Sequence, residues 1–325
     1  MLVLHSRGGE SRIVPAQVEA IELTPEVVWI DLLDPTASEI AAVEEASGLT
    51  LPSRAEISEI ETSSRLRTDG DVLYLSAPLV SRSQTQDPGT TPVGFVLAPE
   101  LLATMRYEPL NSFDTLDRAA QGSAADAFVG LIEAIVDRIA DVLERIAAEL
   151  DMVSHRLFRS RSIDGGGRRT RVQENSDLRS ILRRLGASGD LASKIRDSLL
   201  ALARIVPYVA TMRGSELPAA VKTRLDTLRN DLASLNDYES HLLNKVQLLM
   251  DATLGLINVE QNDIIKVLTV VSVVGVPPTL VASMYGMNFK YMPELDWSWG
   301  YPYGLALIAI SAIAPIIWFK WRGWF

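Results

Sequence analysis

Residues 262–304 read NDIIKVLTVVSVVGVPPTLVASMYGMNFKYMPELDWSWGYPYG, and this stretch decides what kind of protein the chain forms. It contains an apolar run from Ile264 to Met284 whose only charge, Lys266, stands near the start. At about 1.5 Å of rise per residue, a helix over this run reaches roughly 30 Å, the thickness of a bilayer core. A second apolar run extends from Tyr301 to Phe319. The two runs predict two membrane-spanning helices.

Aromatic and basic residues at the ends of the runs support this placement and give its orientation. Indoles gather at membrane–water interfaces, and positive charge stays mainly on the cytoplasmic side. Lys266 stands at the start of the first run and a basic tail, Lys320 and Arg322, follows the second, whereas the short connection carries Lys290, Glu294 and Asp296. We therefore expect an external loop at 289–300, cytoplasmic termini and an inner (plasma) membrane location. The alternative is a buried helix pair in a soluble protein. The flanking tryptophans are Trp297, Trp299, Trp318, Trp321 and Trp324.

The overall composition excludes several classes of protein. The 325 residues include 31 Lys and Arg against 41 Asp and Glu, and this net charge of −10 argues against a nucleic-acid-binding surface. Because the chain has no cysteine, it forms no disulfide, thiolate zinc site or cysteine nucleophile. His5, His155 and His241 do not cluster in the sequence, and no Walker-A-type phosphate loop occurs. We expect no enzymatic activity and no tightly bound cofactor.

The N-terminal part has the mixed pattern of an α/β domain. PTASEIAAVEEASG (35–48) predicts a helix with a glycine stop, and the polar stretch SRSQTQDPGTTP (81–92) predicts a turn or mobile loop. The strand-like runs are VVWIDLLDP (27–35), DVLYLSAPLV (71–80) and VGFVLAPELLATMRY (93–107).

From residue 124 the apolar period becomes helical, which predicts a long antiparallel helical hairpin. One apolar stripe runs from Ile132 to Leu157, and a second helix is expected from about Ser176 to Met212. The glycine run 165–167 separates the two helices.

The stalk helix that follows has the most regular pattern in the chain. From Val221 to Glu260 its apolar positions repeat in alternating steps of four and three, with polar members at Glu239, Thr253 and Glu260. This is a coiled-coil seam. Because no helix-ending signal precedes the membrane, we expect one helix over 219–284.

The turn of the hairpin carries an arginine cluster. The second hairpin helix, roughly 55 Å long, nearly matches the roughly 65 Å of stalk before the membrane, so the turn should return toward the membrane surface. Contact with anionic lipids and a solvated, charge-rich loop both fit this cluster. Its members are Arg156, Arg159, Arg161, Arg168, Arg169 and Arg171.

A polar stripe follows one face of the stalk and of the first apolar run. Inside the run the stripe consists mainly of Thr, Ser and Gly, whereas the other faces carry Val, Leu, Ile and Pro. Polar groups in hydrocarbon need partners, so the stripe faces another helix or water. Stepping by three and four gives Asp251, Gly255, Asn258, Asn262, Ile265, Thr269, Ser272, Val276, Thr279, Ser283 and Gly286.

Association of several copies would turn this stripe into a pore. Two spans cannot enclose a pore, but a coiled-coil stalk that continues into a striped helix can assemble one from several chains. Asp251, Asn258 and Asn262 would then form rings at the cytoplasmic mouth, with oxygen ligands that suit hard cations. Ordinary helix–helix packing is the alternative explanation of the small residues.

The end of the first run carries family-specific motifs. The chain resembles the CorA family of magnesium transporters, GMN-motif type, and the order of its parts extends the resemblance to essentially the whole chain. The motifs are KVLT (266–269), the element from Pro277 to Thr279, YGMNF (285–289), MPEL (292–295) and WGYP (299–302), with looser similarity at WIDLLDP (29–35) and around Arg65 to Tyr74.

The resemblance implies a funnel-shaped homopentamer. In this fold an α+β cytoplasmic domain and a long helical hairpin precede a coiled-coil stalk helix that continues into the first of two C-terminal transmembrane helices. The expected segments are residues 1–123 for the α/β domain, 124–215 for the hairpin, 216–261 for the stalk, 262–288 for the first transmembrane helix, 289–300 for the external loop, 301–319 for the second transmembrane helix and 320–325 for the cytoplasmic tail.

The resemblance also implies transport of Mg²⁺, with Co²⁺ and Ni²⁺ as further ions, down the electrochemical gradient. Gly286, Met287 and Asn288 would form the selectivity filter, and Asn288 and Asp251 would contact the metal. Mg²⁺ gives up its inner waters reluctantly, so an amide ring suits the hydrated ion. Mg²⁺ would also act as a regulatory ligand that closes the channel.

Three features depart from the family pattern. Val276 stands where relatives often carry methionine, Pro277-Pro278 doubles a single proline, and the tail has two basic residues in place of a lysine run. Two other functions therefore stay open. One is a proton-coupled zinc transporter of the same fold, and the other is a non-conducting, membrane-anchored coiled-coil scaffold.

Overall fold

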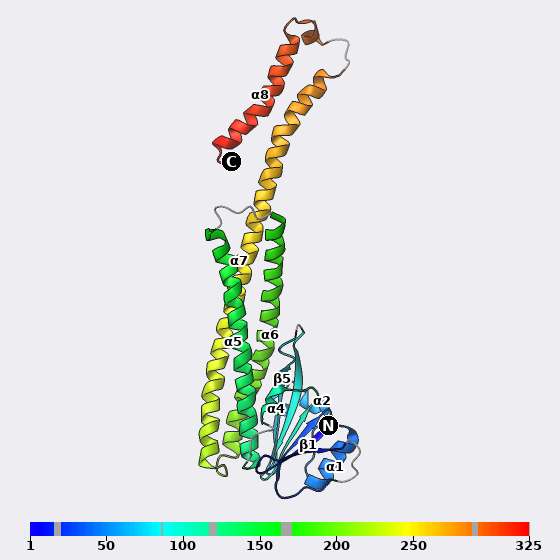
Figure 1. The fold of residues 1–325 in the computed structure, drawn as a ribbon, viewed down its shortest axis with the longest axis vertical. Coiled ribbons are helices and arrows are strands. Elements are labelled where there is room, and N and C mark those ends of the chain that lie inside the picture. The colour runs from blue at the N-terminus through cyan, green and yellow to red at the C-terminus, as the bar shows by residue number, and fades with distance from the viewer. Residues whose placement is uncertain (16–20, 86, 117–121, 164–170, 288–291, 325) are drawn as a thin grey trace. The chain divides into compact units, whose positions relative to one another are not determined.

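The computed structural model of the chain describes residues 1–15, 21–85, 87–116, 122–163, 171–287 and 292–324 (Figure 1). The chain divides into two units. The first comprises Met1–Thr170 and Arg179–Met250, and the second comprises Arg171–Leu178 and Asp251–Phe325.

In the described residues of the first unit, seven strands form one sheet in the order β2-β1-β3-β7-β6-β5-β4. Strands β3 and β7 pair in parallel, and all other neighbours pair antiparallel. Leu2, Ile30, Val96 and Met105 of the strands belong to a buried apolar core, to which residues of α1 also contribute. The strands are β1 (Leu2–Ser6), β2 (Ser11–Val14), β3 (Val27–Leu33), β4 (Leu66–Asp69), β5 (Val72–Ser81), β6 (Gly89–Leu97) and β7 (Leu102–Arg106).

The predicted helix at 35–48 is confirmed as α1 (Ala37–Ser47). The Thr36 side chain accepts a hydrogen bond from the Glu39 backbone N–H, and the Glu39 carboxylate accepts one from the Thr36 N–H. This capping box satisfies two backbone donors at the helix start. Gly48, with a φ of +69°, provides the left-handed residue that ends the helix.

The expected turn or loop at 81–92 is wrong at both ends. β5 continues to Ser81 and β6 begins at Gly89, so Pro78 lies opposite Pro92 in the ribbon of these two strands. Prolines are tolerated there because no third strand among the described residues pairs with this part of the ribbon, since β4 reaches only Leu75 and β7 only Val93. The pairing of flanking residues overrode the local turn signals.

The β-rich run at 93–107 forms the end of β6 and all of β7, with a turn between them in which the Ala98 N–H donates to the Leu101 carbonyl at 2.9 Å. The shorter helices of this unit are α2 (Arg54–Ile57), α3 (Thr62–Arg65) and α4 (Asn111–Leu116).

Three long helices follow the sheet, and they are α5 (Ala124–Ile163), α6 (Arg171–Met212) and α7 (Ala219–Tyr285). Within the first unit they run side by side (Figure 1) and are joined by ion pairs. Arg224 of α7 binds Glu133 of α5 at 2.6 Å, and Arg184 of α6 binds Glu149 of α5 at 2.9 Å. The second helix of the hairpin thus begins five residues before the expected Ser176, and the glycines at 165–167 lie outside the described residues.

The apolar seam of α7 packs against the chain's own helices. Leu225, Leu228, Leu232 and Leu242 are at most 2% exposed in the single chain, and Val246 lies in van der Waals contact distance of the Gly189 position in α6. The expectation that this seam joins separate copies is therefore wrong. The heptad pattern was read correctly as a helix seam, but α5 and α6 occupy it.

One seam position holds a buried carboxylate. Glu239 is 1% exposed, and its Oε2 lies 3.9 Å from Nη1 of Arg196 in α6. Its Oε1 has no hydrogen-bond partner in the described part of the chain. Burial raises the pKa of Glu239 above its ordinary value of 4.5, and the Arg196 charge offsets only part of this effect. Burial therefore disfavours the ionised form of the Glu239 side chain.

We expect Glu239→Leu to stabilise the chain by about 1 to 4 kcal/mol at neutral pH, because apolar packing replaces a poorly paired buried charge. Because folding raises the pKa of Glu239, the folded chain binds more protons at this carboxyl group than the unfolded chain does at pH values between the two pKa values. The stability that Glu239 contributes is therefore complete below about pH 4.5 and is lost as the pH rises through the folded pKa.

Thermal unfolding measured between pH 4 and 8 checks this. In the Glu239→Leu variant, stability should no longer show the decline with rising pH that ionisation of Glu239 causes in the parent. Asp237→Leu, an exposed carboxylate on the same helix, is the control and should shift stability by no more than about 0.5 kcal/mol. A Glu239→Leu variant that is less stable than the parent at pH 8 contradicts the argument.

Candidate functional site

The second unit contains two helices that are long and apolar enough to cross a membrane. They are the C-terminal part of α7 and α8 (Gly300–Trp321), and the short 3₁₀ helix η1 (Pro293–Asp296) lies between them in the sequence. None of the apolar window of α7 and only 6% of that of α8 is buried inside the chain. The core helices of a soluble protein would be mostly covered, so these exposed apolar surfaces are of the kind that lipid or another protein surface covers.

The polar stripe of α7 lies on a face that the chain itself leaves open. Thr269 is half-buried, and the other stripe members inside the apolar run are exposed. The opposite face is partly covered, with half-buried Val270, Val274, Val281 and Tyr285. The exposed members, in chain order, are Asp251, Gly255, Asn258, Asn262, Ile265, Ser272, Val276, Thr279, Ser283 and Gly286.

The two threonine hydroxyl groups of the stripe donate to the backbone of their own helix. Thr269 Oγ1 donates to the Ile265 carbonyl and Thr279 Oγ1 to the Gly275 carbonyl, both at 2.8 Å. Such bonds satisfy polar side chains in hydrocarbon. A hydroxyl that donates to the backbone keeps its lone pairs, so each threonine still presents an acceptor oxygen. Acceptors without competing donors suit a cation or its water shell.

Two adjacent prolines modify the same helix without ending it. Pro277 and Pro278 lie inside α7, which continues to Tyr285. Proline has no N–H, so the carbonyls of Val273 and Val274 lose the donors that an α-helix normally provides four residues on. Further backbone oxygens are thus left without their usual helical partners along the apolar run.

α7 ends at the predicted filter. The Gly286 N–H donates to the Ala282 carbonyl at 3.0 Å, and the Met287 N–H donates to the Met284 carbonyl at 3.3 Å. A Cβ on Gly286 would lie 3.2 Å from the Ala282 oxygen, so close approach rather than a positive φ favours glycine here. Met287 is 48% exposed. Asn288 lies outside the described residues.

The connection to α8 and the basic tail are described in part. Trp297 packs edge-on against Tyr303 at a ring distance of 6.2 Å, which joins the connection to the start of α8. Asp296, Lys320 and Arg322 are exposed, and the Glu294 side chain lies outside the described residues. In the arginine cluster, Arg168 and Arg169 also lie outside them, as do the side chains of Arg159, Arg161 and Arg171.

A buried polar network in the sheet is a second group of charged side chains, and the sequence analysis missed it. Nη2 of Arg106 lies 2.7 Å from Oδ2 of Asp31, and each side chain is 4% exposed. Thr104 donates to Asp31 Oδ1 at 2.8 Å, and the Trp29 indole donates to Thr104 at 3.0 Å. Because the carboxylate is held by these donors, the network is structural. The parallel pairing of β3 with β7 brings its members together, and no local motif signals that pairing.

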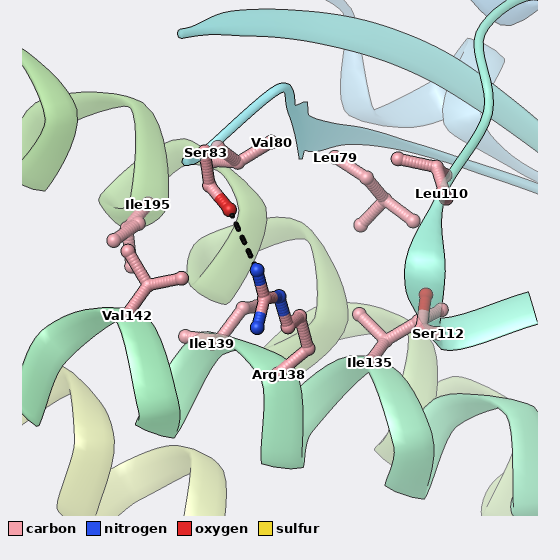
Figure 2. A pocket seen from close by; sticks show the side chains of 10 residues that line it. All are labelled: Leu79, Val80, Ser83, Leu110, Ser112, Ile135, Arg138, Ile139, Val142 and Ile195. Atoms are coloured by element: carbon pink, nitrogen blue, oxygen red, sulfur yellow. Dashed lines mark hydrogen bonds between the residues drawn. The ribbon is translucent and has the colours of Figure 1, made fainter. Parts of the chain in front are cut away.

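A small cavity lies where the sheet meets the long helices (Figure 2). It has a volume of about 30 Å³ and is lined mainly by apolar side chains, among them Ile135, Ile139 and Val142 of α5. Arg138 donates to Ser83 Oγ at 3.3 Å on its wall. This space holds a water molecule or two and is too small for a hydrated Mg²⁺ ion. In the described parts of the chain, no three His, Asp or Glu side chains gather to hold a metal ion.

Comparison with known proteins places the chain in a family. Residues 25–321 match the family described as CorA-like Mg²⁺ transporter protein. The magnesium transport protein CorA of Yersinia pseudotuberculosis serotype I is 33% identical over 303 residues, which cover 91% of this chain and 92% of that protein. The magnesium transport protein CorA of Escherichia coli K12 is 32% identical over 320 residues, which cover 97% of each.

A solved structure shows the same fold. The complete structure of the CorA magnesium transporter from Methanocaldococcus jannaschii aligns with a TM-score of 0.72 at 18% sequence identity, and it covers 100% of this chain and 99% of that one. The sequence matches, the fold and the striped helix next to the GMN tripeptide are all consistent with this family. The chain therefore belongs to the family of CorA-like Mg²⁺ transporter proteins.

Proposed function

We propose that the chain is one subunit of a homopentameric channel that carries divalent cations across the inner membrane. Mg²⁺ is the main ion, and Co²⁺ and Ni²⁺ are further ones. Relatives over almost the whole length are named magnesium transport proteins. The observation that carries the proposal is the hydroxyl stripe of α7, which runs along an apolar helix and, apart from the half-buried Thr269, is left exposed by the described residues of the chain.

Association of several copies would bring their stripes together around one path. Stripes that face a common axis line a water-filled path with acceptor oxygens and leave the apolar faces for lipid. Asp251, Asn258 and Asn262 would form rings of oxygen ligands at the cytoplasmic end. The stalk seam is filled by α5 and α6, so association would use the other faces of α7 and the neighbouring subunits' surfaces.

The Asn288 side chains would form the outer selectivity ring, next to Gly286 and Met287. Five amide oxygens can hydrogen-bond the water shell of Mg²⁺ without stripping it, which suits an ion that exchanges its inner waters reluctantly. The membrane potential supplies about 2.3 kcal/mol per charge per 100 mV, and twice that for a divalent ion. Inward transport therefore needs no ATP.

Liposomes loaded with a fluorescent Mg²⁺ indicator test the proposal. We expect saturable Mg²⁺ influx with the parent chain and loss of that influx with Asn288→Ala, because the outer amide ring is removed. Asn230→Ala, an exposed amide on the stalk, is the matched control and should leave influx unchanged. Both variants should be compared at equal amounts of folded, reconstituted protein.

Zn²⁺ and a pH dye run in parallel separate the alternatives. Zinc influx with proton movement and no Mg²⁺ signal would assign the chain to proton-coupled zinc transport. Absence of flux for every ion from well-folded oligomers would assign it to a non-conducting scaffold.

Regulation by Mg²⁺ on the cytoplasmic side is part of the same proposal. Influx should fall as Mg²⁺ on that side rises through millimolar concentrations. A constant influx over this range contradicts regulation but leaves the transport proposal intact.

A further inference from the structure

The end of α8 folds back on itself. The helix ends at Trp321, and Gly323 then adopts a left-handed φ of +72°. The Trp324 N–H donates to the Phe319 carbonyl at 3.0 Å, and the Gly323 N–H donates to the Lys320 carbonyl at 3.2 Å. These two bonds define a Schellman motif, in which glycine provides the residue that other side chains strain to adopt. We call Trp318–Trp324 the α8 cap.

An aromatic cluster accompanies this motif. The Trp324 and Trp318 rings both lie against Phe319, each with a centroid distance of 5.1 Å. Phe319 is therefore only 2% exposed. The indoles themselves remain open to the surroundings, at 49% for Trp318 and 42% for Trp324, and Trp321 is 85% exposed. The α8 cap thus presents indole rings around a covered apolar centre.

Two positive charges stand among these rings. The Arg322 guanidinium lies over the Trp318 ring, 5.6 Å from its centroid, and Lys320 is exposed. Neither forms an ion pair with any carboxylate among the described residues. The preceding acidic residue in the sequence is Asp296, on the far side of the apolar helix. The α8 cap therefore combines exposed indoles with two positive charges that form no ion pair among the described residues, next to an apolar span.

We propose that the α8 cap binds the headgroup layer of anionic phospholipids, with its indoles at the level of the glycerol and ester groups and Lys320 and Arg322 on lipid phosphates. Indoles favour this layer because they are apolar rings with a polar N–H, and lysine and arginine near an anionic leaflet are attracted to it. The inference rests on the membrane placement of α8 in the proposed function. It does not depend on which ion the protein carries.

Quenching of tryptophan fluorescence by brominated lipids tests this proposal. The full chain with Trp297→Phe and Trp299→Phe retains the indoles of the α8 cap and Trp29, which is 1% exposed within the sheet. In bilayers of phosphatidylcholine with some phosphatidylglycerol, bromine is placed on one lipid or the other. We expect brominated phosphatidylglycerol to quench more than brominated phosphatidylcholine at equal content.

Charge and motif can be separated by variants. K320Q/R322Q should lower the preference for phosphatidylglycerol about thirtyfold, and K320R/R322K should retain it. Lys222→Gln with Arg229→Gln, which removes two exposed charges from the stalk, is the matched control and should change nothing. Gly323→Ala keeps both charges but strains the turn, so it should weaken the preference and make Phe319 less well covered.

Three results would overturn the proposal. The first is equal quenching by the two lipids in the parent chain. The second is an unchanged lipid preference in K320Q/R322Q. The third is a change in the oligomer size of K320Q/R322Q without a change in its lipid preference. The last would assign the α8 cap to contact between copies. No ion gradient enters the measurement, so failure of Asn288→Ala to stop Mg²⁺ influx and failure of the lipid preference are independent outcomes.

Discussion

Val276→Trp is expected to reduce Mg²⁺ influx to the level of protein-free liposomes. Val276 is 62% exposed and lies in the middle of the α7 stripe, between Ser272 and Thr279. If copies of the stripe line a common path, an indole from every subunit would fill the path and exclude water and ions at that level. The measurement is influx into indicator-loaded liposomes at equal protein content.

Val267→Trp is the matched control. Val267 is 48% exposed on the same helix, but steps of 100° per residue place it on the side away from the stripe. It should therefore retain most of the influx. Equal loss of influx in both variants would show that bulk anywhere on α7 disturbs the protein, and the stripe would lose its assignment as the path.

Asp31→Ala should cause a large loss of stability in the sheet. It leaves the Arg106 side chain, which is 4% exposed, without its counter-ion, and an uncompensated buried charge costs about 3 to 5 kcal/mol. For a unit of this size the midpoint of thermal unfolding should fall by about 10 °C. Thermal unfolding of the full chain in detergent, followed by circular dichroism, measures this shift.

Glu100→Ala provides the comparison. Glu100 pairs with Arg7 at 3.2 Å, but the two side chains are 85% and 49% exposed. Removing an exposed pair of this kind changes stability by about 1 kcal/mol or less. If the two variants unfold at the same temperature, the Asp31–Arg106 pair is not the structural centre that its burial indicates.

The membrane helices and the long helical elements were predictable because each has a pattern that repeats along its own sequence. The apolar run before Gly286 needs only the count of residues and charges, and the stripe from Ile132 needs only the helical period. The same holds for α1, whose Thr36 and Gly48 mark its two ends. Such signals are local, so no knowledge of neighbours is required.

The partners of these elements were less accessible. The seam of α7 was read as a contact between copies, but Leu228 and Leu242 are covered by helices of the same chain. A heptad pattern states that a face is covered, and it does not say by which helix. The same limit applies to Asp31 and Arg106, which the parallel pairing of two distant strands brings together.

The sequence predicted which residues of the candidate site share one face of the helix, but not how such faces from several copies would be arranged into a path for ions. Periodicity placed Ser272, Val276 and Thr279 on one face, and the structure shows that the chain leaves this face open. How many stripes meet depends on surfaces of several copies, which one sequence does not count. The role of Asn288 comes from the family motif and is tested by influx.

The filled seam of α7 also bears on how the protein is made. Because α5 and α6 already cover the apolar residues of the stalk, the first unit can reach its native packing as a single chain, before any other copy is met. Oligomers whose core is shared between chains must fold and associate in one step, and their stability then depends on concentration. In the proposed oligomer, folding of each subunit would therefore precede assembly, and a newly synthesised subunit would not expose the seam of its stalk while it is alone.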